Sequence, residues 1–160
     1  MKGIWLLTLI VLLRGWAAGA DTADIEPLSL HDAAAVKDAG DNLARCAGVY
    51  RGAAELMRRS GRADAAAYAE SVSSGALFAA YLLLTSPTAV EAKIFDSVDP
   101  NVHIEALAWG SERNFVMMDE QAESGTVAVL RACTATVSLH SSVLRGALPV
   151  LATAEAHSVR

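Results

Sequence analysis

The sequence predicts an all-α fold: an antiparallel bundle of about four helices, the third broken or kinked near Asp99-Pro100, with one disulfide bond. Apolar residues recur at alternating steps of three and four over long stretches, which is the seam spacing of bundle helices. Glycine and proline signals separate these stretches from one another. The two cysteines, Cys46 and Cys133, lie in the first and the last of them.

Residues 1–20 are predicted to be a signal peptide. Lys2 precedes an apolar core at residues 4–13, and small residues ending at Ala20 form an A-x-A-like cleavage site. The core is too short to span about 30 Å of hydrocarbon as a helix. We therefore expect cleavage after Ala20 and a periplasmic or secreted protein, with an uncleaved anchor as the alternative. Residues 21–28 then form a flexible acidic arm.

Composition limits the functions open to the mature chain. The formal charge is -5 for the whole sequence and becomes -7 once cleavage of the leader has removed Lys2 and Arg14. An acidic chain binds nucleic acid poorly, because that affinity comes from phosphate neutralisation. We assign residues 29–153 to one helical domain and residues 154–160 to a tail, and we expect no stable membrane insertion after cleavage.

The first helix is predicted from Ser29 to Arg59. Ser29, followed by an acid three residues later, has the form of a capping box, and Ser60-Gly61 supplies a stop. Asp41 and Arg45 have the spacing of an ion pair on the helix surface. The seam consists of Val36, Ala39, Leu43, Cys46, Tyr50, Ala53 and Met57.

The second helix is predicted over residues 62–84. Small residues fill its middle, at 71–76, and allow a neighbouring backbone to approach closely. Its end, at 77–84, is apolar on nearly every side, so we expect that end to be deeply buried. Ser86-Pro87 then starts a short helix that runs to about Ser97.

The third long helix is predicted to start at Pro100 and to end near Glu123. A residue before proline disfavours the helical region, so we expect a break at Asp99. Ile104, Ala108, Ser111, Phe115, Met118 and Ala122 mark its inner face, with Leu107 and Trp109 widening it.

The last element is predicted to be a helix from about Thr126 to Pro149. It is rich in β-branched residues, so a strand is the competing prediction. Helix is favoured because the pattern persists for about six turns, which is too long for a typical strand. Its seam consists of Thr126, Leu130, Cys133, Val137, His140, Leu144 and Ala147.

Cys46 and Cys133 are predicted to form a disulfide bond. Cys46 lies about two-thirds of the way along its helix and Cys133 about one-third of the way along its own. If these helices are antiparallel neighbours, the two cysteines lie at the same level along the bundle. Exported chains also meet oxidising compartments. Two buried free thiols are the alternative.

His140 is the leading candidate for a ligand-binding side chain. It lies on the predicted inner face of the last helix, and bundle cytochromes bind haem through histidine and methionine. Met57, Met117 or Met118 is the candidate second ligand, with Met57 the first choice, while a structural histidine at a helix margin is the alternative. Without a Glu-x-x-His or c-type haem motif, we assign no metal or cofactor.

Charged side chains on the first and third helices are candidates for docking a partner protein. The alternative is an ordinary solvated face. The aromatic residues at helical spacing are predicted to pack in the core: Tyr50, Tyr68, Phe78, Tyr81, Trp109 and Phe115. The docking candidates are Arg51, Arg58, Arg62, Glu105, Glu112 and Asp119.

The motif inventory predicts that the protein is not an enzyme. The sequence contains no nucleophile elbow, P-loop, dinucleotide-binding fingerprint or zinc spacing. We therefore expect an exported protein that binds another protein of the cell envelope, as an inhibitor, an immunity factor or an accessory subunit. The alternative is a carrier of haem, metal or a small ligand around His140. In layout, though not in any motif, the chain is similar to some secretion-system immunity proteins.

Overall fold

A computed structural model describes residues 31–120, 125–136 and 138–145 of the chain. The predicted signal peptide, acidic arm and tail lie outside these residues. Every element within the described ranges is helical, so the all-α fold class is confirmed and the competing strand for the last element is wrong. The helices are α2 (Ala33–Arg59), α3 (Ala63–Leu84), α4 (Pro87–Glu91), α5 (Pro100–Glu120) and α6 (Gly125–Ala132).

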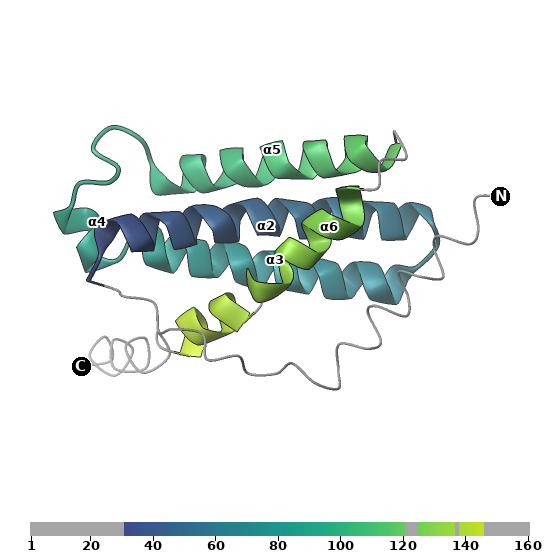
Figure 1. Cartoon of the computed structure of the whole chain (residues 1–160), viewed down its shortest axis with the longest axis horizontal. Helices are drawn as coiled ribbons and strands as arrows, with labels where there is room; N and C mark the ends of the chain where they lie inside the picture. Colours follow the sequence, from purple (N-terminus) through teal and green to yellow (C-terminus); the bar gives the residue numbers. More distant parts are fainter. Residues whose placement is uncertain (1–30, 121–124, 137, 146–160) are drawn as a thin grey trace, which may run out of the picture.

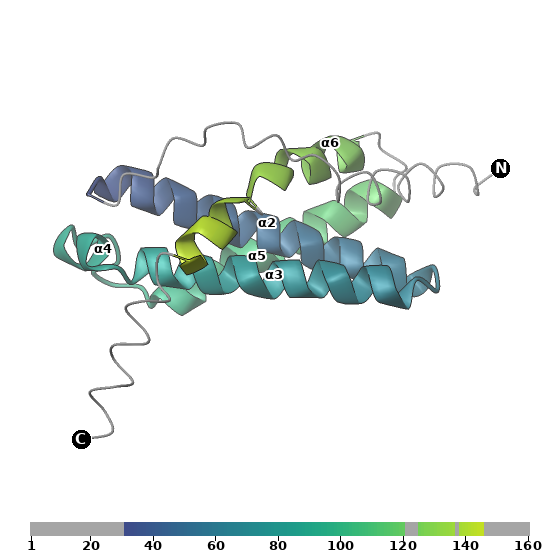
Figure 2. The ribbon, with the colours of Figure 1, turned by 90° about the horizontal axis from the view of Figure 1, so that it is seen from below.

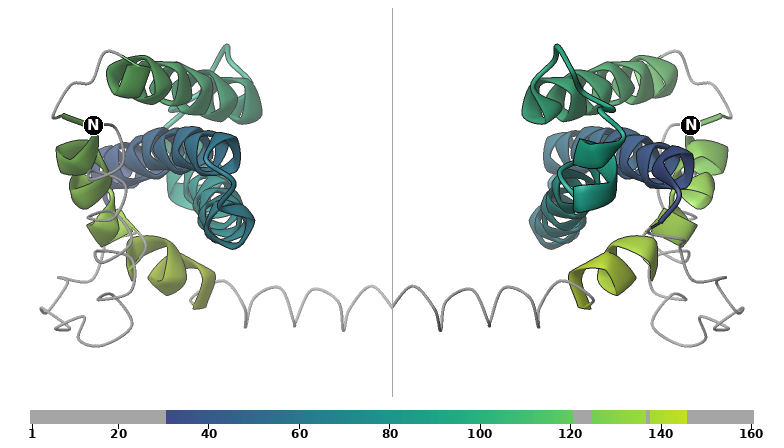
Figure 3. Two further views of the ribbon diagram at one scale, coloured as in Figure 1. Left: turned by 90° about the vertical axis from the view of Figure 1, so that its right-hand side faces the viewer. Right: turned by 90° about the vertical axis from the view of Figure 1, so that its left-hand side faces the viewer.

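The central element of the bundle is α2 (Figure 1). The end-on views show α3 and α5 on different sides of α2, and α2 contacts each of them far more than they contact each other (Figure 3). Along the chain, α3 runs antiparallel to α2, and α5 returns parallel to it. More than half of the residues of α2 are consequently buried.

The start of α2 differs from the prediction, whereas its end agrees. The helix begins at Ala33, not at Ser29, because the Asp32 carboxylate itself caps it by accepting the Ala34 N–H at 2.9 Å. At the other end, Gly61 adopts a φ of 74°, and its N–H donates to the Arg58 carbonyl at 3.0 Å. A residue with a Cβ is strained in this left-handed conformation, which is why glycine suits the stop.

The break before α5 is confirmed, but the short helix ends earlier than predicted. Ser86 caps α4 by accepting the Ala89 N–H at 3.3 Å. The helix then ends at Glu91 rather than near Ser97, and Lys93 adopts a φ of 51°, outside the helical region.

Glycines on α2 bring its neighbours unusually close. A Cβ at Gly48 would lie 1.9 Å from the carbonyl oxygen of Ala108 on α5, and one at Gly40 would lie 2.5 Å from the Leu84 side chain on α3. At the same level, the Ser73 hydroxyl of α3 donates to the α2 carbonyl of Ala47 at 2.8 Å. The small residues in the middle of α3 therefore allow the close approach that the sequence predicted.

The last helix lies across α2 obliquely instead of alongside it (Figure 2). No residue of Gly125–Ala132 is buried. The chain turns at Cys133, where the Thr136 N–H donates to the Cys133 carbonyl at 3.1 Å, and residues 134–136 and 138–145 are again helical. The predicted continuous helix is thus interrupted at its cysteine.

Within the described residues, two helical stretches are long and apolar enough to cross a membrane by length and composition: Ala63–Leu84 and Gly125–Arg145. In the first, 44% of the most apolar window is buried inside the molecule, and in the second 12%. The core helix of a soluble protein passes the same test, so this property alone assigns neither helix to a membrane.

Candidate functional site

The disulfide bond between Cys46 and Cys133 is confirmed. The sulfur atoms lie 2.02 Å apart and the Cα atoms 5.4 Å apart, which excludes the alternative of two free thiols. The Thr136 hydroxyl donates to the Cys46 sulfur at 3.3 Å. The bond joins the middle of α2 to the turn that interrupts the last helix.

Arg51, a candidate for docking a partner, forms ion pairs within the molecule. Its guanidinium lies 3.4 Å from the Glu105 carboxylate and 3.6 Å from the Glu112 carboxylate. Both acids belong to α5 and were themselves docking candidates. This cluster therefore connects α2 to α5, and the spacing within one helix could not reveal it.

Arg58 and Arg62, at the turn between α2 and α3, are also engaged or covered. Arg58 pairs with Glu55 of its own helix and lies 2.7 Å from the Glu70 carboxylate on α3. Arg62 is half-buried, and one of its terminal nitrogens has no partner among the described residues. Asp119, the remaining docking candidate, is exposed on α5.

Asp41 is the buried centre of a polar cluster that the sequence did not predict. Its carboxylate lies 2.5 Å from the Lys37 ammonium and 2.8 Å from His103 Nε2 on α5. Burial raises the pKa of Asp41, but the hydrogen bonds from Lys37 and His103 outweigh it, so the pKa lies below its usual value. The predicted surface pair with Arg45 is wrong, because Arg45 is exposed while Asp41 is only 6% exposed.

His140 and Met57 do not come together as a ligand pair. The His140 ring packs against Gly75 of α3, where an added Cβ would lie 3.4 Å from Nε2. The contact between Ser73 and Ala47 shows that Gly75 lies at about the level of Ala47 along the bundle. Met57 is buried ten residues further along α2, so some 15 Å of helix separates Met57 from His140. Burial lowers the pKa of His140, and its Nδ1 has no partner among the described residues.

Tyr50 also keeps a polar atom without a described partner. Its ring is buried in the core next to the disulfide, as predicted, and its hydroxyl makes no hydrogen bond to a described residue. Burial, with a smaller contribution from Tyr68, raises the pKa of Tyr50 to about 12. The hydroxyl is therefore neutral across the physiological range.

Four of the aromatic residues predicted to be buried are exposed instead. Trp109 does not widen the inner face of α5, since 56% of it is exposed. Its ring carries the Arg113 guanidinium 4.7 Å above its centre. On α3, the aromatic side chains at positions 68, 78 and 81 are also solvent-facing, so the end of this helix is buried on one side only.

The outward face of α5 forms a continuous row of side chains, which we call the α5 stripe. Val102 is 62% exposed and Met117 is 48% exposed. Its members lie on the side of α5 opposite the buried residues Ile104, Ala108 and Phe115, and all except Gly110 are exposed. The stripe consists of Val102, Ala106, Trp109, Gly110, Arg113 and Met117.

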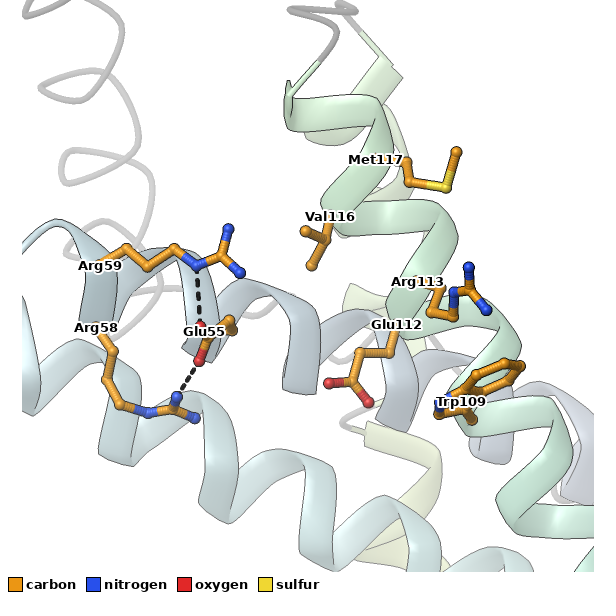
Figure 4. A pocket seen from close by; sticks show the side chains of 8 residues that line it. All are labelled: Glu55, Arg58, Arg59, Trp109, Glu112, Arg113, Val116 and Met117. Atoms are coloured by element: carbon orange, nitrogen blue, oxygen red, sulfur yellow. Dashed lines mark hydrogen bonds and ion pairs between the residues drawn. The ribbon is translucent and has the colours of Figure 1, made fainter.

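A groove of about 410 Å³ runs between the end of α2 and this part of α5. The close-up shows Trp109, Arg113 and Met117 projecting from one side of α5, whereas Val116 and Glu112 point toward α2 (Figure 4). On the α2 side, Glu55 pairs with both arginines that line the groove, at positions 58 and 59. The groove is open, and neither it nor any other described part of the chain holds three or more His, Cys, Asp or Glu side chains placed to bind a metal ion.

The chain matches no protein-family model, and no curated protein or solved structure matches it either. Functional conclusions therefore depend on the geometry of this molecule alone.

Proposed function

We propose that the protein is exported and acts by binding another protein of the cell envelope, as an inhibitor, an immunity factor or an accessory subunit. The supporting observation is the gathering of large apolar side chains on the outward faces of α3 and α5. Single exposed apolar residues are ordinary, whereas rows of them on one face are typical of protein-binding surfaces.

The outward face of α3 suits an amphipathic helix of the partner. Phe78 and Tyr81 are 47% and 38% exposed at one end of this face. Towards the other end the exposed residues are small, at Ala67, Ser71 and Ser74, so a second helix can lie close to the backbone. Acidic residues of α3 border the face, which favours a partner helix with basic flanks.

Crosslinking in the producing cell tests this proposal. A photo-reactive residue at Phe78 should form an adduct of one defined mass with a second polypeptide, and the same residue at Asn42, exposed on α2, should not. Ser74→Arg should abolish the adduct by covering the small part of the face, with Asn42→Arg as the matched control. Equal yields from positions 78 and 42 would contradict the proposal.

Export is tested separately by intact-mass analysis of the protein recovered outside the cytoplasm. We expect a chain that begins at Asp21, with the leader removed after Ala20. A mass that retains Met1 would contradict cleavage, and recovery only from the cytoplasm would contradict export.

One observation favours the alternative function of a ligand carrier. The Nδ1 atom of His140 is buried and has no partner among the described residues, and burial favours the neutral ring that binds metals. Bound haem would give the purified protein a Soret absorption band that His140→Ala abolishes. A protein without this band and without stoichiometric metal leaves protein binding as the function.

A further inference from the structure

We propose that the α5 stripe binds the same stripe of a second copy of this chain, forming a two-fold symmetric dimer. This inference goes beyond the proposed function: it assigns the outward face of α5 to a second copy and leaves the outward face of α3 to the partner protein. It starts from a glycine in the middle of α5 that contacts with the described part of the chain do not explain.

Gly110 differs from the glycines of α2. A Cβ added at Gly48 would meet the α5 backbone, but one added at Gly110 meets no described atom within 4 Å. A glycine inside a helix costs about 1 kcal/mol relative to alanine. Among the described residues, this cost has no compensating contact, so we infer that a second molecule makes use of the missing side chain.

The stripe consists of two ridges whose members are four residues apart. One ridge is small, with Val102, Ala106 and Gly110, and the other is large, with Trp109, Arg113 and Met117. Ridges at this spacing pack into each other's grooves when two helices cross. The small ridge of one helix leaves room on its surface, and the large ridge of the other helix can fill that room.

A two-fold axis near the middle of α5 brings these ridges together twice. In this antiparallel arrangement, Trp109 of each copy lies over Gly110 of the other, and Met117 lies beside Val102. In the same arrangement, Arg113 of each copy lies beside Ala106 of the other. Each large side chain therefore meets a small or apolar one, as a self-complementary interface requires.

The charges of α5 fit the same arrangement. Arg113 of one copy reaches the level of Glu105 in the other, because Glu105 precedes Ala106. The Glu105 side chain is 59% exposed, and its contact with Arg51 within the chain is long, at 3.4 Å. Two equivalent Arg113–Glu105 pairs would therefore close the edges of the dimer.

Sedimentation equilibrium of the purified, disulfide-bonded chain tests the dimer. We expect a reversible dimer whose dissociation constant rises at least about tenfold in Gly110→Leu, since the new side chain occupies the place of the partner's Trp109. Asn114→Leu, an exposed position on α5 beside the stripe, is the matched control and should leave the dissociation constant unchanged. Circular dichroism verifies that both variants stay folded.

A charge exchange tests the pairing of Arg113 with Glu105. Arg113→Glu and Glu105→Arg should each weaken the dimer, and the double variant should restore it. A wild-type chain that stays monomeric at the highest soluble concentration, or a Gly110→Leu variant that dimerises normally, would overturn the inference. If position 78 still crosslinks a partner in that case, the proposed function stands and only the dimer fails.

Discussion

The two contacts that α2 makes with α5 and with the last helix differ in kind. The contact with α5 is continuous: the backbones meet at Gly48 and Ala108, and Asp41 bonds His103. The contact with the last helix is narrow, centred on the disulfide bond and the hydroxyl of Thr136. The helix α5 is held by packing along its length, and the last helix by the covalent bond together with partly buried side chains at Val129, Leu130, Leu139 and Val143.

This difference shows why α5 and the last helix respond to different changes. A packed contact depends on the size of each residue in it, so one added methyl group disturbs it. A covalent bond tolerates poor packing around it, which allows the helix Gly125–Ala132 to remain attached without a single buried residue. Three changes, from the largest expected effect to the smallest, test this comparison.

Removing the disulfide bond is expected to have the largest effect. The bonded cysteines are 87 residues apart, and closing a loop of that length stabilises a fold by about 4–5 kcal/mol in the chain-entropy model. The double variant Cys46→Ala/Cys133→Ala should lose this free energy of unfolding in urea. Hydrogen exchange should then accelerate more in residues 125–145 than in α2.

Wild-type protein with the disulfide bond reduced is the control, because it lacks the covalent bond but keeps both cysteine side chains. It should lose the same free energy of unfolding as the alanine variant. A loss below about 1 kcal/mol, or uniform exchange in all helices, would show that packing alone secures the last helix.

Gly48→Ala is expected to have the second-largest effect, because it disturbs the contact between α2 and α5. The new Cβ would lie 1.9 Å from the Ala108 carbonyl oxygen, so the two backbones must separate. Overpacking of this kind costs about 3 kcal/mol. Urea unfolding at a concentration where the chain is monomeric measures the loss.

Gly110→Ala is the matched substitution on the outward side of α5. It should raise the free energy of unfolding by up to about 1 kcal/mol, because alanine favours the helix and no described atom obstructs it. Equal effects of the two substitutions would contradict the close contact at Gly48.

Asp41→Asn is expected to have the smallest destabilising effect, about 1–3 kcal/mol at neutral pH, because it weakens the bonds to Lys37 and His103. The pKa of Asp41 is lowered in the folded state, so its carboxylate contributes stability above the unfolded pKa of about 3.9. This contribution is lost as the pH falls through the folded pKa.

The stability difference between wild type and Asp41→Asn should therefore be constant near neutral pH and shrink below about pH 4. Asp38→Asn, at an exposed position on the same helix, should show little difference at any pH. A gap that persists in acid would mean that the amide disturbs packing rather than charge.

The sequence by itself determined the helices, their approximate ends and the covalent link. Seam spacing identifies helices because apolar residues three and four apart share a face. Ser60-Gly61 and Pro100 mark boundaries because glycine readily adopts the left-handed conformation that ends a helix, and proline suits only the first turn of one. The pairing of Cys46 with Cys133 was indicated by their matching heights, and with only two cysteines no other pairing was available.

Only the tertiary structure decided which residues meet across helices. Asp41 has the spacing of a surface ion pair, yet α5 covers it and supplies His103. Trp109 resembles a core residue, yet α2 already occupies the other side of α5, because Gly48 brings the two backbones together there. One helix carries two possible faces, and the choice between them depends on the position of its neighbours, which periodicity along a single chain does not record.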